Sequence, residues 1–222
     1  MLTGGGSPVL IHDETLERTT NGRGLVCETP DEVLGQLDAG KGFDLRFVGE
    51  PIPTLEAAAE RCLQLGLWAN VEIKPSAGLD EATARVVVPR ARQLWARAAQ
   101  APLLSSFSGR ALELAAELAP ELPRGVLVEE VPADWEARCR RIAAVALHVQ
   151  ARRLDREIVA TVRAAGLWVV TYTVNDPEHA QTLFSWGVDC VITDRPDLVR
   201  GPDGGRVPSL AADPASVPAG SC

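Results

Sequence analysis

The residues best suited to chemistry lie in the segment Asn70-Val71-Glu72-Ile73-Lys74-Pro75. Side chains alternate along a strand, so we expect Val71 and Ile73 to face one way and Glu72 and Lys74 the other. A carboxylate and an ammonium on one face of an apolar strand are costly unless they meet each other, a metal or a ligand. Glu72 is therefore a candidate ligand for a hard divalent cation and Lys74 for a phosphate, with a structural ion pair as the alternative.

A second candidate ends the segment Pro8-Val9-Leu10-Ile11-His12-Asp13. His12 follows an apolar run directly, and an imidazole can take up or give a proton near neutral pH. The alternative is a loop histidine followed by Asp13 as a turn former. The other two histidines are weaker candidates: His148 either reaches the end of a strand or packs inside, and we expect His179 to be solvated in the first turn of a helix.

Short apolar, β-branched runs alternate with amphipathic stretches and predict the elements that position these residues. The runs cover residues 9–11, 71–73, 103–107, 126–128, 145–149, 168–174 and 188–193, and the clearest helical stretches cover 55–65, 110–118, 158–165 and 178–186. Such alternation is typical of βα units around a parallel sheet. In these folds chemistry is placed at the carboxyl ends of the strands, where Pro75 puts Glu72 and Lys74.

Residues at the helix ends support this pattern. Thr29-Pro30-Asp31-Glu32 predicts a capping box, with proline at the first helical position. Asp155 and Asp176 are expected to cap the helices that follow them, and Gly187 to end the second of these helices. Pro89 predicts that the helix around it is kinked or split.

Two architectures fit alternating units: a doubly wound sheet and a (β/α)₈ barrel. No strand is followed by a G-x-G-x-x-G or P-loop pattern, which disfavours the nucleotide-binding version. A complete barrel takes about 250 residues, so seven candidate strands leave this chain one unit short. We expect one domain over residues 1–200 and a disordered tail over 201–222, which are rich in Gly, Pro, Ala and Ser.

Composition excludes several classes of protein. The 222 residues carry a net charge of −8, which argues against nucleic acid or an anionic membrane surface as the main partner. No apolar run approaches the roughly 20 residues of a membrane span. The five cysteines include no C-x-x-C pair, so neither a disulfide framework nor a zinc site is expected. We therefore expect a cytoplasmic protein from a reducing compartment.

Taken together, the motifs over residues 5–200 resemble those of the glycerophosphodiester phosphodiesterases, most closely the cytosolic bacterial branch. The resemblance is carried by a signature of the form H-D-x-x-L-x-R-T-T-x-G-x-G over residues 12–24, followed in order by Ile52-Pro53-Thr54-Leu55, Val71-Glu72-Ile73-Lys74, Ser105-Ser106-Phe107, Tyr172-Thr173-Val174-Asn175 and Thr193-Asp194-Arg195-Pro196. The conjunction of these motifs is far more specific than any one of them.

This resemblance implies a TIM (β/α)₈ barrel that hydrolyses glycerophosphodiesters to glycerol 3-phosphate and an alcohol, a reaction of lipid and glycerol metabolism. It implies a divalent cation, Mg²⁺ or Ca²⁺, as cofactor. By the same resemblance, His12 acts as acid/base, Glu72 binds the metal and Lys74 contacts the phosphate. The implied partner is a small-molecule diester, with no nucleic acid or membrane partner, and the chain is a candidate homo-oligomer.

The sequence departs from the family pattern, because H-R-G, E-N-T and E-x-D motifs occur nowhere in it. In the family these motifs precede the H-D motif, so we expect an N-terminally truncated barrel with about seven strands and impaired hydrolysis. One alternative is a catalytically inactive barrel fragment that binds phosphate or a protein. Another is a lipid-headgroup phosphodiesterase of the phospholipase C or D type, which the lack of a membrane-binding helix disfavours.

Overall fold

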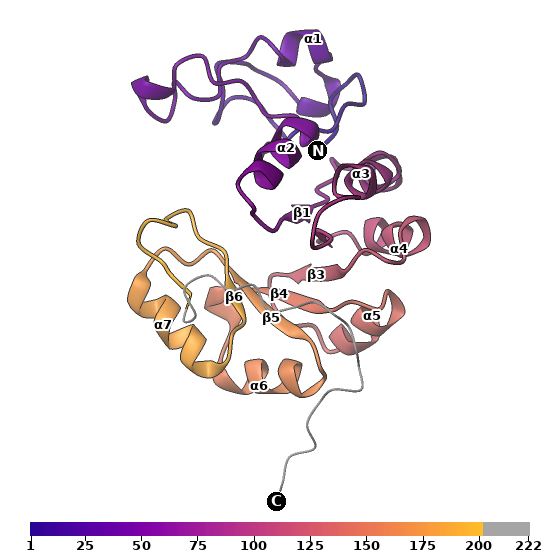
Figure 1. Cartoon of the computed structure of the whole chain (residues 1–222), viewed down its shortest axis with the longest axis vertical. Coiled ribbons are helices and arrows are strands. Elements are labelled where there is room, and N and C mark those ends of the chain that lie inside the picture. Colours follow the sequence, from indigo (N-terminus) through magenta and orange to yellow (C-terminus); the bar gives the residue numbers. More distant parts are fainter. Residues whose placement is uncertain (202–222) are drawn as a thin grey trace, which may run out of the picture.

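The computed structural model of the chain describes residues 1–201. Its centre is one parallel sheet of six strands, in the order β1-β2-β3-β4-β5-β6. The strands are β1 (Asn70–Glu72), β2 (Leu103–Ser106), β3 (Arg124–Val128), β4 (Ala146–Gln150), β5 (Trp168–Tyr172) and β6 (Cys190–Val191). The sheet curls with its helices along the outside, as in part of a (β/α) barrel (Figure 1).

Helices alternate with the strands as the sequence pattern predicts. They are α1 (Asp31–Leu34), α2 (Leu55–Gln64), α3 (Asp80–Leu94), α4 (Gly109–Leu118), α5 (Trp135–Arg141), α6 (Arg156–Ala164) and α7 (Pro177–Trp186), with short 3₁₀ turns η1 (Val26–Glu28), η2 (Leu45–Phe47) and η3 (Ala151–Arg153). Among residues 1–201, no helix has both the length and the apolar character needed to cross a bilayer.

The alternation of side chains along the strands builds the core between sheet and helices. In β4, Leu147 and Val149 are fully buried and pack in one cluster with Val159 and Val162 of α6. The residue between them in the strand, His148, faces the inner side of the curled sheet. Around β1 a second cluster joins the helices α2, α3 and α4 to Ile73.

Most of the predicted helix ends are confirmed. The Asp155 carboxylate accepts from the Ile158 N–H at 2.8 Å, and Asp176 accepts from the Glu178 N–H at 2.8 Å. Gly187 ends α7 in the left-handed region, at φ 100°, where a side chain would be strained.

Two of the predictions for helix ends and helix breaks fail. The capping box at Thr29 is wrong, because the Thr29 hydroxyl donates to the carbonyl of Leu25 and Pro30 precedes the helix instead of starting it. Of the two outcomes predicted at Pro89, a kinked or a split helix, the split is wrong, because α3 runs without a break from Asp80 to Leu94.

The prediction of seven strands is wrong by one. Residues 9–11 form no strand, and Val9 makes only an isolated antiparallel bridge to Thr54. Apart from the short helix α1 and the turns η1 and η2, the first 52 residues form irregular loops around their own small cluster, which includes Leu16, Val26 and Ile52. This part of the chain lies beyond α2, at one end of the molecule (Figure 1). Apart from Gly201, the predicted tail over residues 201–222 lies outside the described residues.

Candidate active site

The three residues predicted to carry chemistry come together in the structure. The Lys74 ammonium donates to the backbone carbonyl of His12 at 2.7 Å, across 62 positions of sequence. His12, Glu72 and Lys74 all line one cavity of about 280 Å³, whose remaining walls are largely apolar. The end of β1 and the N-terminal segment thus place a carboxylate, an ammonium and an imidazole around one space large enough for a small ligand.

The end of β1 is held in place by its neighbour β2. The Ile73 N–H donates to the carbonyl of Ser105 at 2.7 Å, and the Ser106 hydroxyl donates to the carbonyl of Ile73 at 2.5 Å. Ile73 is buried in the cluster with the helices, as alternation predicts, and Glu72 is paired with Ser105 in register on the opposite face. Because backbone bonds fix this strand end, Glu72 and Lys74 start from defined positions.

The structure also bears on the alternative of a structural ion pair. Within residues 1–201 no salt bridge joins Glu72 to Lys74, since the Lys74 ammonium is directed to the His12 carbonyl. Glu72 is exposed to the cavity and has no hydrogen-bonding partner among the described side chains. A carboxylate and an ammonium that share a cavity without pairing are both available to a ligand.

His12 is oriented by the residue that follows it. Its Nδ1 lies 2.7 Å from Asp13 Oδ1, and the Arg18 guanidinium donates twice to the same carboxylate, at 2.5 and 2.7 Å. The bonds from Arg18, and then the bond from His12, hold the pKa of Asp13 far below its usual range. An anionic Asp13 favours the tautomer with the proton on Nδ1 of His12, which leaves Nε2 unprotonated as the working nitrogen of the neutral ring.

Asp13 and Arg18 are the site residues that sequence reasoning missed. Asp13 was predicted only as a turn former, and no role was assigned to Arg18. The available signal was a carboxylate next to the histidine with an arginine five positions later. In an irregular segment this spacing has no fixed geometry, so only the structure shows that the two groups meet.

The donor set for a metal is sparse in the described chain. Residues 1–201 contain no group of three or more His, Cys, Asp or Glu side chains arranged to hold an ion. Ca²⁺ takes six to eight oxygen ligands, whereas Mg²⁺ keeps several waters and is often held by one or two carboxylates plus substrate phosphates. Glu72 is the carboxylate of the cavity that such an ion could use, beside a lysine suited to a phosphate.

The polar residues at the ends of the last two strands form hydrogen bonds that stabilise the neighbouring loops. The Asn175 amide donates to Asp194 at 3.0 Å, and its oxygen accepts from the Thr193 hydroxyl and the Asp194 N–H. The Tyr172 hydroxyl donates to the carbonyl of Val128, and burial raises the pKa of Tyr172 to about 12. These contacts fix the loops after β5 and β6, and none of these residues lines the cavity of His12.

His148 does not reach the end of its strand, so that alternative is wrong. Its side chain is fully buried, and within residues 1–201 neither ring nitrogen has a hydrogen-bonding partner. Burial lowers the pKa of His148 to about 4. The ring is therefore neutral at physiological pH and packs as a polar member of the interior.

This burial predicts an acid-sensitive fold. The unfolded chain binds a proton at His148 with a pKa near 6.5, whereas the folded chain binds it only near 4. As pH falls below about 6.5 the unfolded state gains protons first, so the free energy of unfolding should fall by about 2 kcal/mol by pH ~5. Urea unfolding at several pH values measures this slope. His148→Leu should flatten it and the control His179→Asn should not; an unchanged slope in His148→Leu would contradict the assignment.

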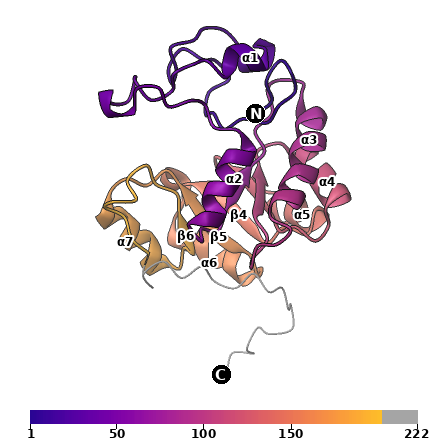
Figure 2. The same ribbon diagram turned by 45° about the horizontal axis from the view of Figure 1, so that its top comes forward.

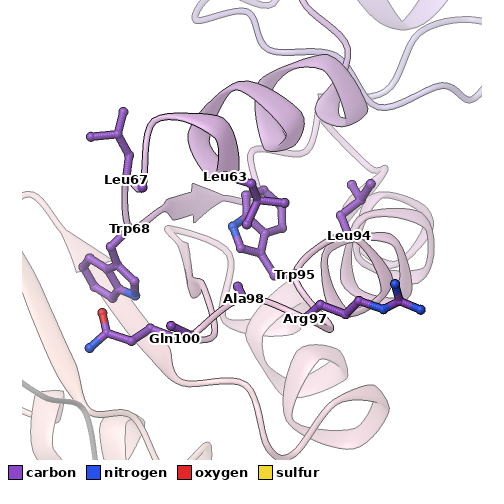
Figure 3. A pocket seen from close by; sticks show the side chains of 10 residues that line it. Leu63, Leu67, Trp68, Leu94, Trp95, Arg97, Ala98 and Gln100 are labelled. Atoms are coloured by element: carbon purple, nitrogen blue, oxygen red, sulfur yellow. The ribbon is translucent and has the colours of Figure 1, made fainter.

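A larger cavity, of about 540 Å³, lies elsewhere (Figure 3). It is bounded by Leu63 in α2, by Leu67 after this helix, by Trp68 before β1, and by Trp95 at the end of α3. None of the three predicted site residues lines it, and among residues 1–201 its one charged lining residue is Arg97. Size alone therefore does not mark the site, because this cavity lies at the amino end of β1, away from the carboxyl ends of the strands.

Comparisons with known proteins show the family of the chain. Residues 1–198 match the model of the glycerophosphoryl diester phosphodiesterase family. The chain is 31% identical over 198 residues to a glycerophosphodiester phosphodiesterase of Caldanaerobacter subterraneus, with 89% of this chain and 81% of that protein covered. It is also 31% identical over 217 residues to a glycerophosphodiester phosphodiesterase of Bacillus subtilis, covering 89% and 72%.

A solved structure shows the same fold. A phosphodiesterase of Oleispira antarctica, in complex with the product sn-glycerol-3-phosphate, superposes with a TM-score of 0.82 at 37% identity. The match covers 88% of this chain and 79% of the other. The six described strands therefore correspond to part of a TIM-type barrel.

Proposed function

Because the chain belongs to the glycerophosphoryl diester phosphodiesterase family, we propose that it hydrolyses glycerophosphodiesters to glycerol 3-phosphate and an alcohol. The observation that carries this proposal is the single cavity where His12, Glu72 and Lys74 meet. The product bound in the Oleispira phosphodiesterase supports glycerol 3-phosphate as the phosphate-bearing product here.

The first task of such a site is to offset charge. A phosphodiester is an anion and repels an attacking water, so a cationic group near the phosphate lowers the barrier. Among residues 1–201, Lys74 provides the cationic side chain that lines the cavity. Its bond to the His12 carbonyl holds the ammonium at the edge of this space, where a phosphate oxygen can become an additional acceptor.

The second task is proton transfer, which we assign to His12. With Nδ1 bonded to Asp13, the free Nε2 can take a proton from the attacking water or, once protonated, give one to the leaving alkoxide. Asp13 is then a positioning residue, because it fixes the tautomer and stabilises the imidazolium. Arg18 keeps Asp13 anionic in both states of the ring.

Glu72 is proposed as a ligand of a divalent cation, Mg²⁺ or Ca²⁺. When bound, such a cation would polarise a phosphoryl oxygen as a Lewis acid. Glu72 would hold the ion from the wall of the cavity that Lys74 also lines. A cytoplasmic setting is part of the proposal, supported by the unbonded thiols of Cys27, Cys62, Cys139 and Cys190.

Release of glycerol 3-phosphate from glycerophosphocholine tests the proposed function. The purified chain is assayed with Mg²⁺, with Ca²⁺ and with excess chelator. We expect metal-dependent turnover that falls at least about 100-fold in chelator. A folded sample that binds inorganic phosphate without any turnover would overturn hydrolysis by this chain and support a phosphate-binding module.

A further inference from the structure

Residues 40–49, here called the 40–49 loop, extend from the N-terminal part of the molecule into open space (Figures 1 and 2). Phe43 is 85% exposed, Leu45 77%, Val48 57% and Phe47 39%. Single exposed apolar side chains are common on proteins, but four within six positions form a patch that needs an explanation.

The base of the loop is closed by specific bonds. The Ala39 N–H donates to the carbonyl of Glu50 at 2.8 Å. One oxygen of the Asp38 carboxylate accepts from the N–H groups of Gly40 and Lys41, and the other accepts from Gly49. These bonds, above all those from Lys41 and Gly49, lower the pKa of Asp38, so the charged carboxylate joins both ends of the loop.

The tip is ordered as well. A Cβ on Gly40 would lie 1.9 Å from the carbonyl oxygen of Phe47, so only glycine permits this close approach. The Asp44 carboxylate accepts from the Arg46 N–H and from the Arg46 guanidinium, which starts the turn η2. The apolar side chains are thus held outward by a built loop.

The charges of the loop leave one exposed cation without a carboxylate partner among residues 1–201. The Arg46 guanidinium is paired with Asp44 and lies 5.6 Å from the centre of the Phe47 ring. Asp38 accepts from backbone N–H groups at the base of the loop, next to the exposed Glu50. Lys41 is exposed, so the apolar patch lies next to one lysine and one internally paired arginine.

We propose that the 40–49 loop inserts into the interface of a phospholipid membrane. Protruding aromatic and aliphatic side chains beside an exposed lysine fit the boundary between acyl chains and phosphates. A protein partner would more often need a flat or concave surface, which a projecting tip does not provide. The expectation of no membrane partner rested on the net charge of the whole chain and on the lack of a membrane-binding helix, whereas this loop presents a local apolar patch on irregular backbone.

The proposal is independent of the hydrolytic activity, and its test measures binding. The full chain is sedimented with vesicles of phosphatidylcholine and phosphatidylglycerol. We expect Phe43→Ser/Leu45→Ser to lower the partition coefficient at least about tenfold, because it removes most of the inserted apolar area. The matched control is Val33→Ser/Leu65→Ser, which removes two exposed apolar side chains elsewhere and should bind as the parent does.

Two further measurements test the role of charge in binding and the insertion of the loop tip. Lys41→Gln should weaken binding to the mixed vesicles a few-fold but leave binding to pure phosphatidylcholine unchanged. A tryptophan at the tip, in Phe43→Trp, should be quenched by brominated lipid beyond the quenching seen in the parent. Parent and double variant binding equally would overturn the proposal. A loss of dimer mass on light scattering in the double variant, without vesicle binding by the parent, would assign the loop to contact between copies instead.

Discussion

Replacing Glu72 by glutamine is expected to lower the rate of metal-dependent glycerol 3-phosphate release at least about 100-fold. The amide keeps the size of the side chain but removes the charge that attracts a divalent cation. Since Glu72 is exposed on the inner face of β1 and pairs with no described cation, the fold should tolerate the change. Initial rates across a series of Mg²⁺ concentrations measure the effect.

A matched control separates ligand loss from a general loss of charge. Glu60 lies on the exposed face of α2 and accepts from the Gln64 amide, so Glu60→Gln should retain the parental rate. Calorimetric titration with Mg²⁺ gives a second readout, in which Glu72→Gln should weaken binding at least about tenfold. If Glu72→Gln hydrolyses substrate within a few-fold of the parent, Glu72 is not the metal ligand.

The second large effect is expected for His12→Ala, again a rate loss of at least about 100-fold. The variant removes the one imidazole that lines the cavity among residues 1–201, and the side chain is 77% exposed, so stability should change little. The pH dependence of kcat/KM should lose the limb that reports the titration of the ring. His179→Ala, in the first turn of α7, serves as the control and should keep the parental profile.

Asp13→Asn helps to interpret this experiment. If Asp13 only positions the ring, its amide should cost less activity than His12→Ala and should leave the pH limb in place. A His12→Ala enzyme that retains both its rate and the limb would show that proton transfer is performed elsewhere.

Hydrophobic pattern predicts the later strands of this chain well. In β4 and β5 the β-branched runs are buried on both faces, so sequence and structure agree within a residue or two. The run at residues 9–11 has a similar composition but lacks a parallel neighbour, because its N–H and carbonyl groups bond to Pro53, Thr54 and the first residues of the chain. Pairing partners, which composition does not contain, decide whether such a run becomes a strand.

Helix caps and side-chain contacts were predictable from the sequence only where a single hydrogen bond determines the local structure. Asp155 and Asp176 cap their helices because an aspartate before a helix has few competing donors nearby. Thr29 had an alternative acceptor at Leu25 and took it. The common face of Glu72 and Lys74 follows from alternation, whereas the bonds from Asp13 to Arg18 and the closure of the 40–49 loop by Asp38 depend on irregular backbone.

The order of the strands also determines which strands can detach from the sheet most easily. Within residues 1–201 each strand hydrogen-bonds only to its neighbours in sequence, so the sheet is a linear array of nearest-neighbour interfaces, like a solenoid. An inner strand such as β4 must break two interfaces to detach, whereas β1 must break one. Amide hydrogen exchange should accordingly be fastest at the ends of the array. Glu72, on β1, therefore rests on a strand whose local unfolding is less costly than that of the centre.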